Sequence, residues 1–328
     1  MSILPTVNPP LFTIFTPTYN RAHTIRRAFD SLCAQTLRDF EWLVIDDGST
    51  DNTSELIAIW DEIANFPVRC VKQTHAGKHF AHNRALVEAK GQFFGILDSD
   101  DALVPDALEK LARLWDSIPE SERHLFCSVG ARCCSQNGNI IGDRFPTDPF
   151  DADMRELAYV YHIDGEKWIC WVTEVFRRYP FPEITGIQFI PEGLICYSIA
   201  KAYRGRWSND AVRVYYVNDQ ETGPTLSKRR QSDHALGRWH YYTWLLNNDL
   251  EYIFRSPRPF IKAAILVPIC AWFSGKTLNE SLRELTSILA KFLVFSTLPL
   301  STLIYLIETC RLRAASGHRS TMPVRPHQ

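Results

Sequence analysis

The sequence predicts an α/β protein built on a mostly parallel β-sheet flanked by helices. Residues 11–16, 41–45, 68–72 and 91–97 are apolar, strand-like runs, and the first three each lead through a loop into apolar residues at helical spacing. Repeated strand–loop–helix units are typical of parallel sheets. Such sheets bind ligands at the carboxyl ends of their strands, and the loops expected there are rich in acids and turn formers.

Four helices are expected in this first part of the chain. Apolar residues recur at helical spacing over residues 25–32, with Thr24 as the expected N-cap, and again over 53–60 and 81–89. A fourth helix begins at Pro105, because proline is favoured in the first turn.

The next hundred residues predict a looser alternation of strands, turns and helices. The expected features, in order, are a strand over 125–133, an Asn-Gly hairpin turn at 137–138, a long loop or lid over 143–164, ordered structure over 167–176, a helix after Pro191 and a strand over 211–217.

The C-terminal part is apolar and helical in pattern. Thr277 and Glu280 have the capping-box spacing, followed by helical spacing to residue 292. The uncharged stretch 292–307 is interrupted by Pro299 and is short for a membrane-spanning helix. Flanking basic residues favour peripheral contact with an anionic membrane surface. The same helices would equally suit a core layer or a homodimer interface.

Bulk composition argues against some classes of function. The 328 residues include 36 basic and 37 acidic side chains, so the charge gives no footprint for a nucleic-acid partner. Nine cysteines without metal-type spacing indicate reduced thiols in the cytoplasm. The N-terminus lacks the basic and apolar regions of a secretory signal, so we expect a cytoplasmic protein, or one at the cytoplasmic face of a membrane.

Three acids, Asp98, Asp100 and Asp101, stand within four residues after the strand at 91–97. Mg²⁺ and Mn²⁺ prefer oxygen ligands and often bind through one or two carboxylates together with substrate phosphates. Clustered carboxylates also repel one another and favour a counter-ion. The alternative is an acidic turn in which Asp101 caps a helix.

Three motifs occur in order: Phe15 to Arg21, Leu43 to Asp51, and Leu97 to Asp101. In these motifs the sequence resembles glycosyltransferase family 2, whose members are inverting, nucleotide-sugar-dependent enzymes of the GT-A fold. The resemblance is dense from Leu11 to Asp106 and thinner to Tyr216. It implies a GT-A domain over residues 1–225. The resemblance does not cover the C-terminus, where the residue pattern predicts a helical appendage over 226–315 and a flexible tail over 316–328.

The resemblance also implies a site for a uridine diphosphate sugar. The nucleotide would lie at Thr16, Pro17 and Tyr19, with Tyr19 near the base and Asp47 accepting a hydrogen bond from the base imide N–H. Asp98-Ser99-Asp100 is similar to the family's DXD motif, which places Asp98 near the ribose.

Asp98 and Asp100 are then the predicted ligands of Mn²⁺ or Mg²⁺, with Asp100 the principal one, and the cation would stabilise the leaving diphosphate. Lys78, Asn83 and Arg84 are candidates for contact with phosphate or sugar, although solvated positions on a helix would explain them as well. Arg84 is the better phosphate candidate of the last two.

Inversion requires a base for the acceptor hydroxyl, and the family places an acid late in the domain at the start of a helix. Glu192 fits that position, with Glu183 as runner-up. Glu192 departs from the commoner acidic pair because Gly193 follows it. A helix-start acid without a catalytic role is the alternative.

Two further sets of residues have two readings. His75, His79 and His82 suggest zinc only weakly, because no cysteine partner is near. Trp168, Trp171 and Trp207 would be acceptor platforms or core.

The predicted reaction is metal-assisted transfer of a sugar from a UDP-sugar to a hydroxyl of a saccharide or lipid-linked saccharide. The alternatives are an inactive nucleotide-sugar-binding or scaffold protein and, less favoured, a nucleotidyltransferase. A nucleotidyltransferase lacks support because the loop after the first strand is not a glycine-rich, basic loop.

Overall fold

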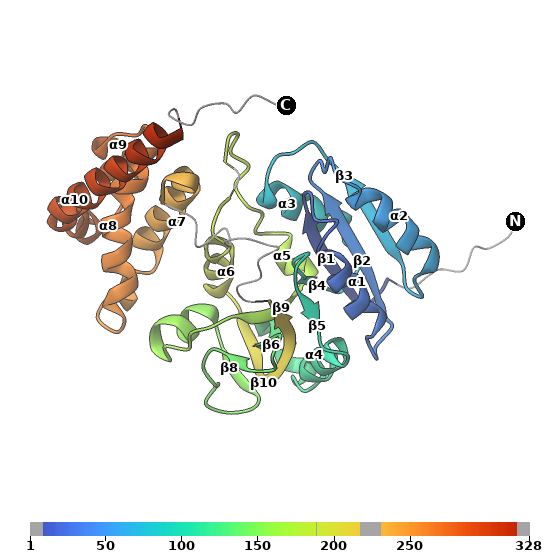
Figure 1. Cartoon of the computed structure of the whole chain (residues 1–328). Helices are drawn as coiled ribbons and strands as arrows, with labels where there is room; N and C mark the ends of the chain where they lie inside the picture. Colours follow the sequence, from blue (N-terminus) through green and yellow to red (C-terminus); the bar gives the residue numbers. More distant parts are fainter. Residues whose placement is uncertain (1–8, 188, 217–230, 320–328) are drawn as a thin grey trace, which may run out of the picture. The chain divides into compact units, whose positions relative to one another are not determined.

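The computed structural model describes residues 9–187, 189–216 and 231–319. The chain divides into two compact units, residues 1–228 and 229–328 (Figure 1). The predicted boundary at 225/226 and the end of the predicted tail, residues 320–328, lie outside the described residues.

Unit 1 contains a single ten-stranded sheet within the described residues. Its strands are β1 (Phe12–Thr18), β2 (Phe40–Asp46), β3 (Val68–Lys72), β4 (Phe93–Ile96), β5 (Ala102–Leu103), β6 (Phe126–Ser135), β7 (Ile140–Ile141), β8 (Phe150–Ala152), β9 (Lys167–Val172) and β10 (Arg204–Tyr215). The order is β3–β2–β1–β4–β9–β6–β10–β5, with β7 beside β6 and β8 beside β10.

The strands that carry the motifs run in the same direction. β1 is parallel to β2 and β4, and β2 is parallel to β3. β9 is antiparallel to both β4 and β6, so β6 and its parallel neighbour β10 also share this direction. The mostly parallel sheet is confirmed, and the loops after β1, β2 and β4 emerge at one edge.

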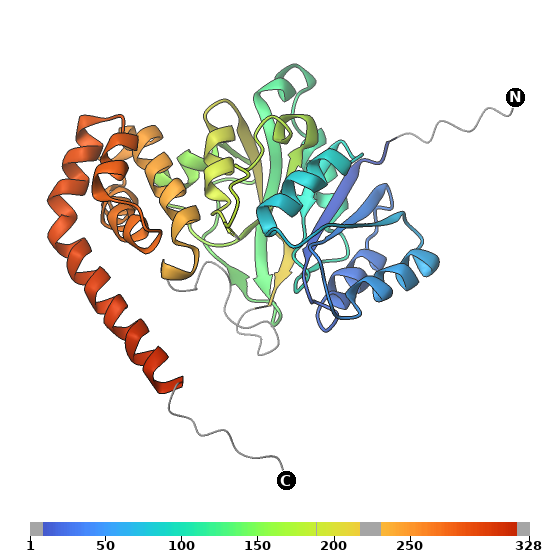
Figure 2. The ribbon, with the colours of Figure 1, turned by 90° about the horizontal axis from the view of Figure 1, so that it is seen from above.

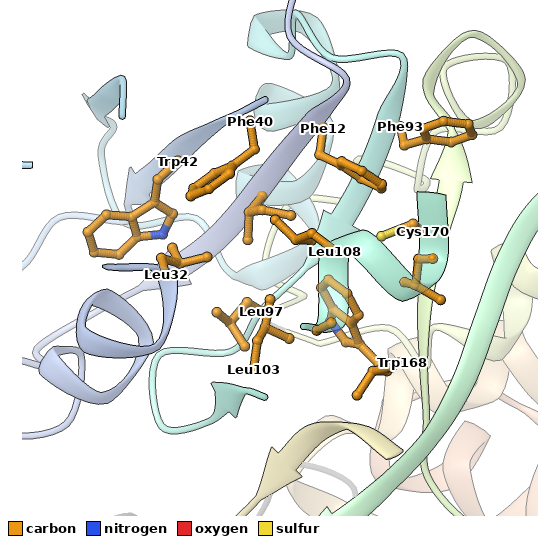
Figure 3. Close-up of a cluster of buried hydrophobic side chains, with 14 of the residues drawn as sticks. Phe12, Leu32, Phe40, Trp42, Phe93, Leu97, Leu103, Leu108, Trp168 and Cys170 are labelled. Atoms are coloured by element: carbon orange, nitrogen blue, oxygen red, sulfur yellow. The ribbon is translucent and has the colours of Figure 1, made fainter. Parts of the chain in front are cut away.

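Helices cover both faces of the sheet (Figure 1). α1 (Arg26–Cys33), α2 (Thr53–Ile63) and α4 (Ala107–Asp116) pack on the face that carries Phe12 and Trp42, where Leu32 and Leu108 join the core (Figure 3). α3 (Lys78–Glu88) and α5 (Thr173–Phe176) pack on the opposite face, where Phe15 points. Burying one such side chain stabilises the fold by about 1.5–3 kcal/mol.

Three expectations for unit 1 were wrong in detail. β10 begins at Arg204 rather than at 211, because its early half pairs with β6 and β8 and buries Trp207. The expected loop 143–164 contains β8 and a π-helical turn, Glu156–Val160, whose apolar residues pack around that tryptophan. Thr24 does not cap α1, whose N-cap residue is Ile25.

The remaining elements of unit 1 are a 3₁₀ helix, Glu120–Leu125, and α6 (Gly193–Ala200). Gly138 has φ +78° in the turn between β6 and β7, which confirms the Asn-Gly hairpin.

Unit 2 contains the 3₁₀ turns Gln231–His234 and Leu250–Tyr252, together with α7 (Ala235–Asn248), α8 (Pro257–Phe273), α9 (Leu278–Glu284) and α10 (Ile288–Arg319). The capping box is confirmed: the Thr277 hydroxyl accepts a hydrogen bond from Glu280 N at 3.2 Å, and Glu280 Oε2 accepts one from Thr277 N at 2.6 Å.

α10 differs from the sequence prediction. It begins as a separate helix after α9 ends, and it continues through Pro299 as one long helix (Figure 2). Packing on α8 buries Ala290, Val294 and Ser301, and Ser301 Oγ donates to Ile265 O at 2.9 Å. These contacts offset the one backbone hydrogen bond that proline removes. The first residues of the predicted tail, 316–319, also belong to α10.

Residues Ile288–Arg313 of α10 form a segment of 26 residues whose most apolar 18-residue window has a mean hydropathy of 1.7, which by length and composition alone is enough to cross a membrane. The uncharged stretch 292–307 is short for a spanning helix, as expected, but the helix that contains it is long enough. Only 17% of its most apolar window is buried.

Candidate active site

The loops after β1, β2 and β3 meet around an aromatic stack. Tyr19 is 43% exposed, and its ring stacks on that of His75 with a centroid distance of 4.2 Å and an interplanar angle of 25°. Asn20, at φ +53°, holds the neighbouring loop in place by accepting hydrogen bonds from Thr50 N and Asp51 N through its side-chain oxygen. Tyr19 is thus presented at the surface, where the sequence predicted a nucleotide base.

Asp47 is buried and already has several partners. Its Oδ1 accepts from Gln73 Nε2 at 2.7 Å and from Ala76 N at 2.9 Å, and its Oδ2 accepts from Gly77 N at 2.9 Å. His75 Nδ1 lies 2.9 Å from Oδ2. Asp47 therefore fixes the turn before α3, and a base imide N–H would have to replace one of these donors.

The other residues predicted to line the nucleotide are less accessible. Thr16 is fully buried, and its hydroxyl accepts from Trp42 Nε1 at 2.9 Å. Pro17 is half-buried, and Ser99 is buried. Thr16 and Ser99 would thus contribute to the site mainly through the backbone that they fix.

One lysine joins a predicted metal ligand to the predicted base. Lys78, the first residue of α3, places Nζ 2.9 Å from Asp98 Oδ1 and 3.0 Å from Glu192 Oε1. Glu192 precedes α6 and makes no side-chain capping bond, so its carboxylate is directed to Lys78 rather than to the helix end. The side chains of Lys78, Asp98 and Glu192 are 25%, 35% and 48% exposed, which leaves the cluster open to a substrate.

The charges of this cluster shift the pKa values of Lys78, Asp98 and Asp100. Burial opposes the charged form of both Lys78 and Asp98, but the opposite charges outweigh it. The neighbouring Asp98 and Glu192 thus raise the pKa of Lys78, and Lys78 and Arg213 lower the pKa of Asp98. Burial and the charge of Asp98 raise the pKa of Asp100. At neutral pH, Lys78 and Asp98 are both ionised.

Asp101 is buried, and its contacts stabilise the fold. It is 2% exposed, its Oδ1 accepts from Tyr216 N at 3.2 Å, and its Oδ2 lies 3.6 Å from Arg213 Nη1. Burial raises its pKa to about 7. Asp101 therefore holds the end of β10 and caps no helix.

The carboxylates of Asp98 and Asp100 suit a cation whose coordination is completed by a bound substrate. Within the described ranges, no three His, Cys, Asp or Glu side chains converge as a preformed metal cage. Asp98 and Asp100 are two hard oxygen donors whose repulsion shows in the raised pKa of Asp100. Mg²⁺ and Mn²⁺ bind in this way when phosphates complete the shell.

Three other candidates gather elsewhere, in a groove of about 590 Å³ along α3. Asn83 bonds to Phe181 N, Phe181 O and Glu183 Oε1, each at 2.9 Å, and Arg84 pairs with Glu88 at 2.7 Å. Asn83 thus ties a loop to the helix, and Glu183, the runner-up base, lies with it. Neither Asp98 nor Glu192 lines this groove.

Arg213 and His82 were missed by sequence reasoning. Arg213 is 7% exposed and also lies 3.2 Å from Glu166 Oε2. An arginine inside an alternating apolar strand was the available signal for it. His82 was considered only as a zinc ligand, and it lies beside the Lys78 cluster, lining a cavity with Asp98 and Glu192. Trp168 and Trp171 line the same cavity, whereas Trp207 is core.

Known proteins resemble this chain in sequence and in fold. Residues 13–129 match the family model described as Glycosyl transferase family 2. A chondroitin synthase of Pasteurella multocida (strain Pm70) is 46% identical over 155 residues, which are 47% of this chain and 15% of that protein. This chain therefore matches only a small part of that relative's length.

Solved structures share the fold. S. aureus TarS 1–349, in complex with UDP-GlcNAc, aligns with a TM-score of 0.58 and 20% identity, over 88% of this chain and 80% of that one. GalNAc-T7 with UDP, GalNAc and Mn²⁺ aligns with a TM-score of 0.51 and 15% identity, over 84% of this chain and 57% of that one. Residues 13–129 of this chain therefore resemble glycosyltransferase family 2, and the sheet that they help to form has the GT-A fold.

Proposed function

We propose that this chain transfers a sugar from a UDP-sugar to a hydroxyl group of a saccharide, with inversion at the anomeric carbon and with Mn²⁺ or Mg²⁺ bound. The observation that carries the proposal is the Lys78 bridge, which joins a carboxylate of the DXD-like motif to a carboxylate at the start of a helix. These are the two kinds of acid that such a reaction needs.

The comparisons support the choice of substrates. The TarS structure contains UDP-GlcNAc, and the GalNAc-T7 structure contains UDP and Mn²⁺. The similarity to a chondroitin synthase favours a saccharide acceptor, free or lipid-linked. The donor nucleotide, the cation and the acceptor are part of the proposal.

Each residue has a distinct task in the proposed reaction. Asp98 and Asp100 would hold the cation, which neutralises charge on the leaving diphosphate when it is bound. Glu192 accepts the proton of the acceptor hydroxyl as that oxygen attacks the anomeric carbon. Lys78 orients the Glu192 carboxylate, and it adds positive charge beside the donor. Tyr19 offers its exposed ring to the base.

The decisive test is the Mn²⁺-dependent binding of UDP to an Asp100→Asn variant. Ligands that bind only the folded state raise its melting temperature. We expect UDP with Mn²⁺ to raise the Tm of the wild type more than UDP with EDTA, and Asp100→Asn to abolish that difference. Asp106→Asn is the matched control, because Asp106 pairs with Lys110 on the surface of α4 at 3.0 Å. An undiminished Mn²⁺ effect in Asp100→Asn would refute the metal assignment.

The assays also separate the alternatives. UDP binding without transfer to any acceptor of a broad panel would favour an inactive nucleotide-sugar-binding protein. Release of pyrophosphate from a nucleoside triphosphate would favour a nucleotidyltransferase.

We further propose that α10 rests on an anionic membrane surface, which would place the chain at the cytoplasmic face. Its outward side chains are apolar, with Phe292 65% and Phe295 66% exposed, and Lys291, Arg311 and Arg313 flank them. The charge-free stretch 292–307 would span about 24 Å at 1.5 Å per residue. The whole segment 288–313 is long enough to cross a hydrocarbon core of roughly 30 Å, but a crossing would bring Lys291 or Glu308 beside this stretch into the core, so we place the helix in the interface.

Sedimentation of the full chain with vesicles tests this placement. We expect binding to vesicles that contain anionic lipid and loss of binding in Phe292→Asp/Phe295→Asp, with far-UV circular dichroism unchanged. Val87→Asp, on the surface of α3 at 76% exposure, is the control. A chain that stays in solution with vesicles, or one that forms a dimer through this face, would contradict the placement.

A further inference from the structure

A small cavity adjoins the Lys78 cluster, and the proposed reaction does not yet use it. Its volume is about 80 Å³, and both Asp98 and Glu192 are among the residues that line it. One part of its wall is aromatic and almost completely buried, formed by Trp168, Trp171, Phe176 and Phe181, and the charged side chains of Lys167 and Arg213 also line it. The cavity therefore lies beside the position where the anomeric carbon of a donor sugar would be.

His82 contributes a polar group to this wall. It is 2% exposed, and neither ring nitrogen has a hydrogen-bond partner among the described residues. The rings of Phe15, Phe94, Phe176 and Phe181 surround it at centroid distances from 4.9 to 6.0 Å, in edge-on orientations.

Burial and the charge of Lys78 lower the pKa of His82 to about 3, so the imidazole is neutral and offers one donor and one acceptor. A buried polar group without a partner is destabilising. A ligand group that enters the cavity would supply the missing hydrogen bond.

The cavity restricts what that group can be. Its volume corresponds to roughly two or three water molecules at 30 Å³ each. A hydroxyl would leave most of the aromatic side chains without contact. A carboxylate could pair with Arg213 or Lys167 of the wall, but it has no apolar part for the aromatic rings. An acetamido group has a methyl for the aromatic rings and an amide that can bond to the imidazole. At carbon 2 of a sugar, it is attached to the carbon next to the anomeric carbon.

We infer that this cavity is the subsite for the 2-acetamido group of the donor sugar, with His82 as its hydrogen-bond partner. The inference rests on the proposed function and narrows its donor to a UDP-N-acetylhexosamine. His82 is thus a specificity-determining residue, beside the residues that perform the transfer.

The test compares the affinities of matched donors by titration calorimetry with Mn²⁺. The pairs are UDP-GlcNAc with UDP-glucose, and UDP-GalNAc with UDP-galactose, and UDP alone is the reference. We expect the wild type to bind at least one UDP-N-acetylhexosamine about tenfold more tightly than the matched UDP-hexose, which has a hydroxyl at carbon 2. His82→Phe should reduce that ratio about tenfold and leave the affinity for UDP unchanged, since one hydrogen bond is lost.

Stability provides a second readout. His82→Phe removes an unpaired imidazole from an aromatic cage, so its Tm should be equal to or above that of the wild type. His82→Gln keeps an amide donor and acceptor and should retain most of the ratio. His79→Phe is the control, because His79 is equally buried on the same helix and does not line the cavity.

The outcomes are separable. A wild type that binds UDP but shows no preference for an acetamido sugar would overturn this inference alone. An unchanged ratio in His82→Phe would do the same. A wild type that does not bind UDP would overturn the proposed function, and with it the assignment of this cavity.

Discussion

The assignment of the base leads to a prediction in which two glutamates are compared. Glu192→Gln removes a negative charge whose carboxylate lies 3.0 Å from Lys78 Nζ. The carboxylate is 48% exposed, so water screens the pair, and its loss should cost the fold no more than about 1 kcal/mol. For a unit of about this size, that corresponds to a decrease in Tm of roughly 2–4 °C.

The expected effect on the reaction is much larger. Removing a general base slows transfer by about 10²- to 10⁴-fold, or roughly 3–5 kcal/mol in the barrier. UDP binding should remain within about threefold of the wild type, because a glutamine occupies the same volume. The chemical effect therefore exceeds the stability effect several times over, and the two are measured independently.

Glu183→Gln is the matched control for this experiment. Glu183 was the alternative base, but its carboxylate accepts from Asn83 Nδ2 at 2.9 Å and lies in the α3 groove. Both variants are assayed for transfer from UDP-sugars to chondroitin oligosaccharides and a wider saccharide panel. Transfer should survive in Glu183→Gln and fail in Glu192→Gln. The opposite result would refute the reasoning, whatever the stabilities of the two variants.

Two further predictions concern residues that organise the site. Asn83→Ala removes three hydrogen bonds to the loop at Phe181 and should lower the free energy of unfolding by about 1–3 kcal/mol in a urea titration. UDP affinity should not change, and a weakened affinity with unaltered stability would restore Asn83 as a ligand contact. Gly77→Ala forces a side chain onto a residue at φ +110°, at a cost of roughly 1–3 kcal/mol. A decrease in Tm of less than 1 °C would contradict the expected backbone strain at residue 77.

Local patterns in the sequence were sufficient for much of the fold. Strand and helix positions follow from the period of the apolar residues, and the Asn-Gly turn and the capping box at Thr277 depend on neighbours within four residues. The start of β10 was missed because Gly205, Asn209 and Asp210 are poor strand residues. Pairing with β6 and β8, far along the chain, stabilises that segment instead.

The candidate site also has one part that follows from the sequence and one that follows only from the tertiary structure. The sequence by itself determined that acids follow β4, that an aromatic loop follows β1, and that a glutamate precedes α6, because each is a short-range pattern. Only the tertiary structure decided that Lys78 joins Asp98 to Glu192, over separations of 20 and 114 residues. It also decided that His82 faces a cavity without a partner. Such contacts depend on how helices pack across the sheet, and no local period along the chain encodes that packing.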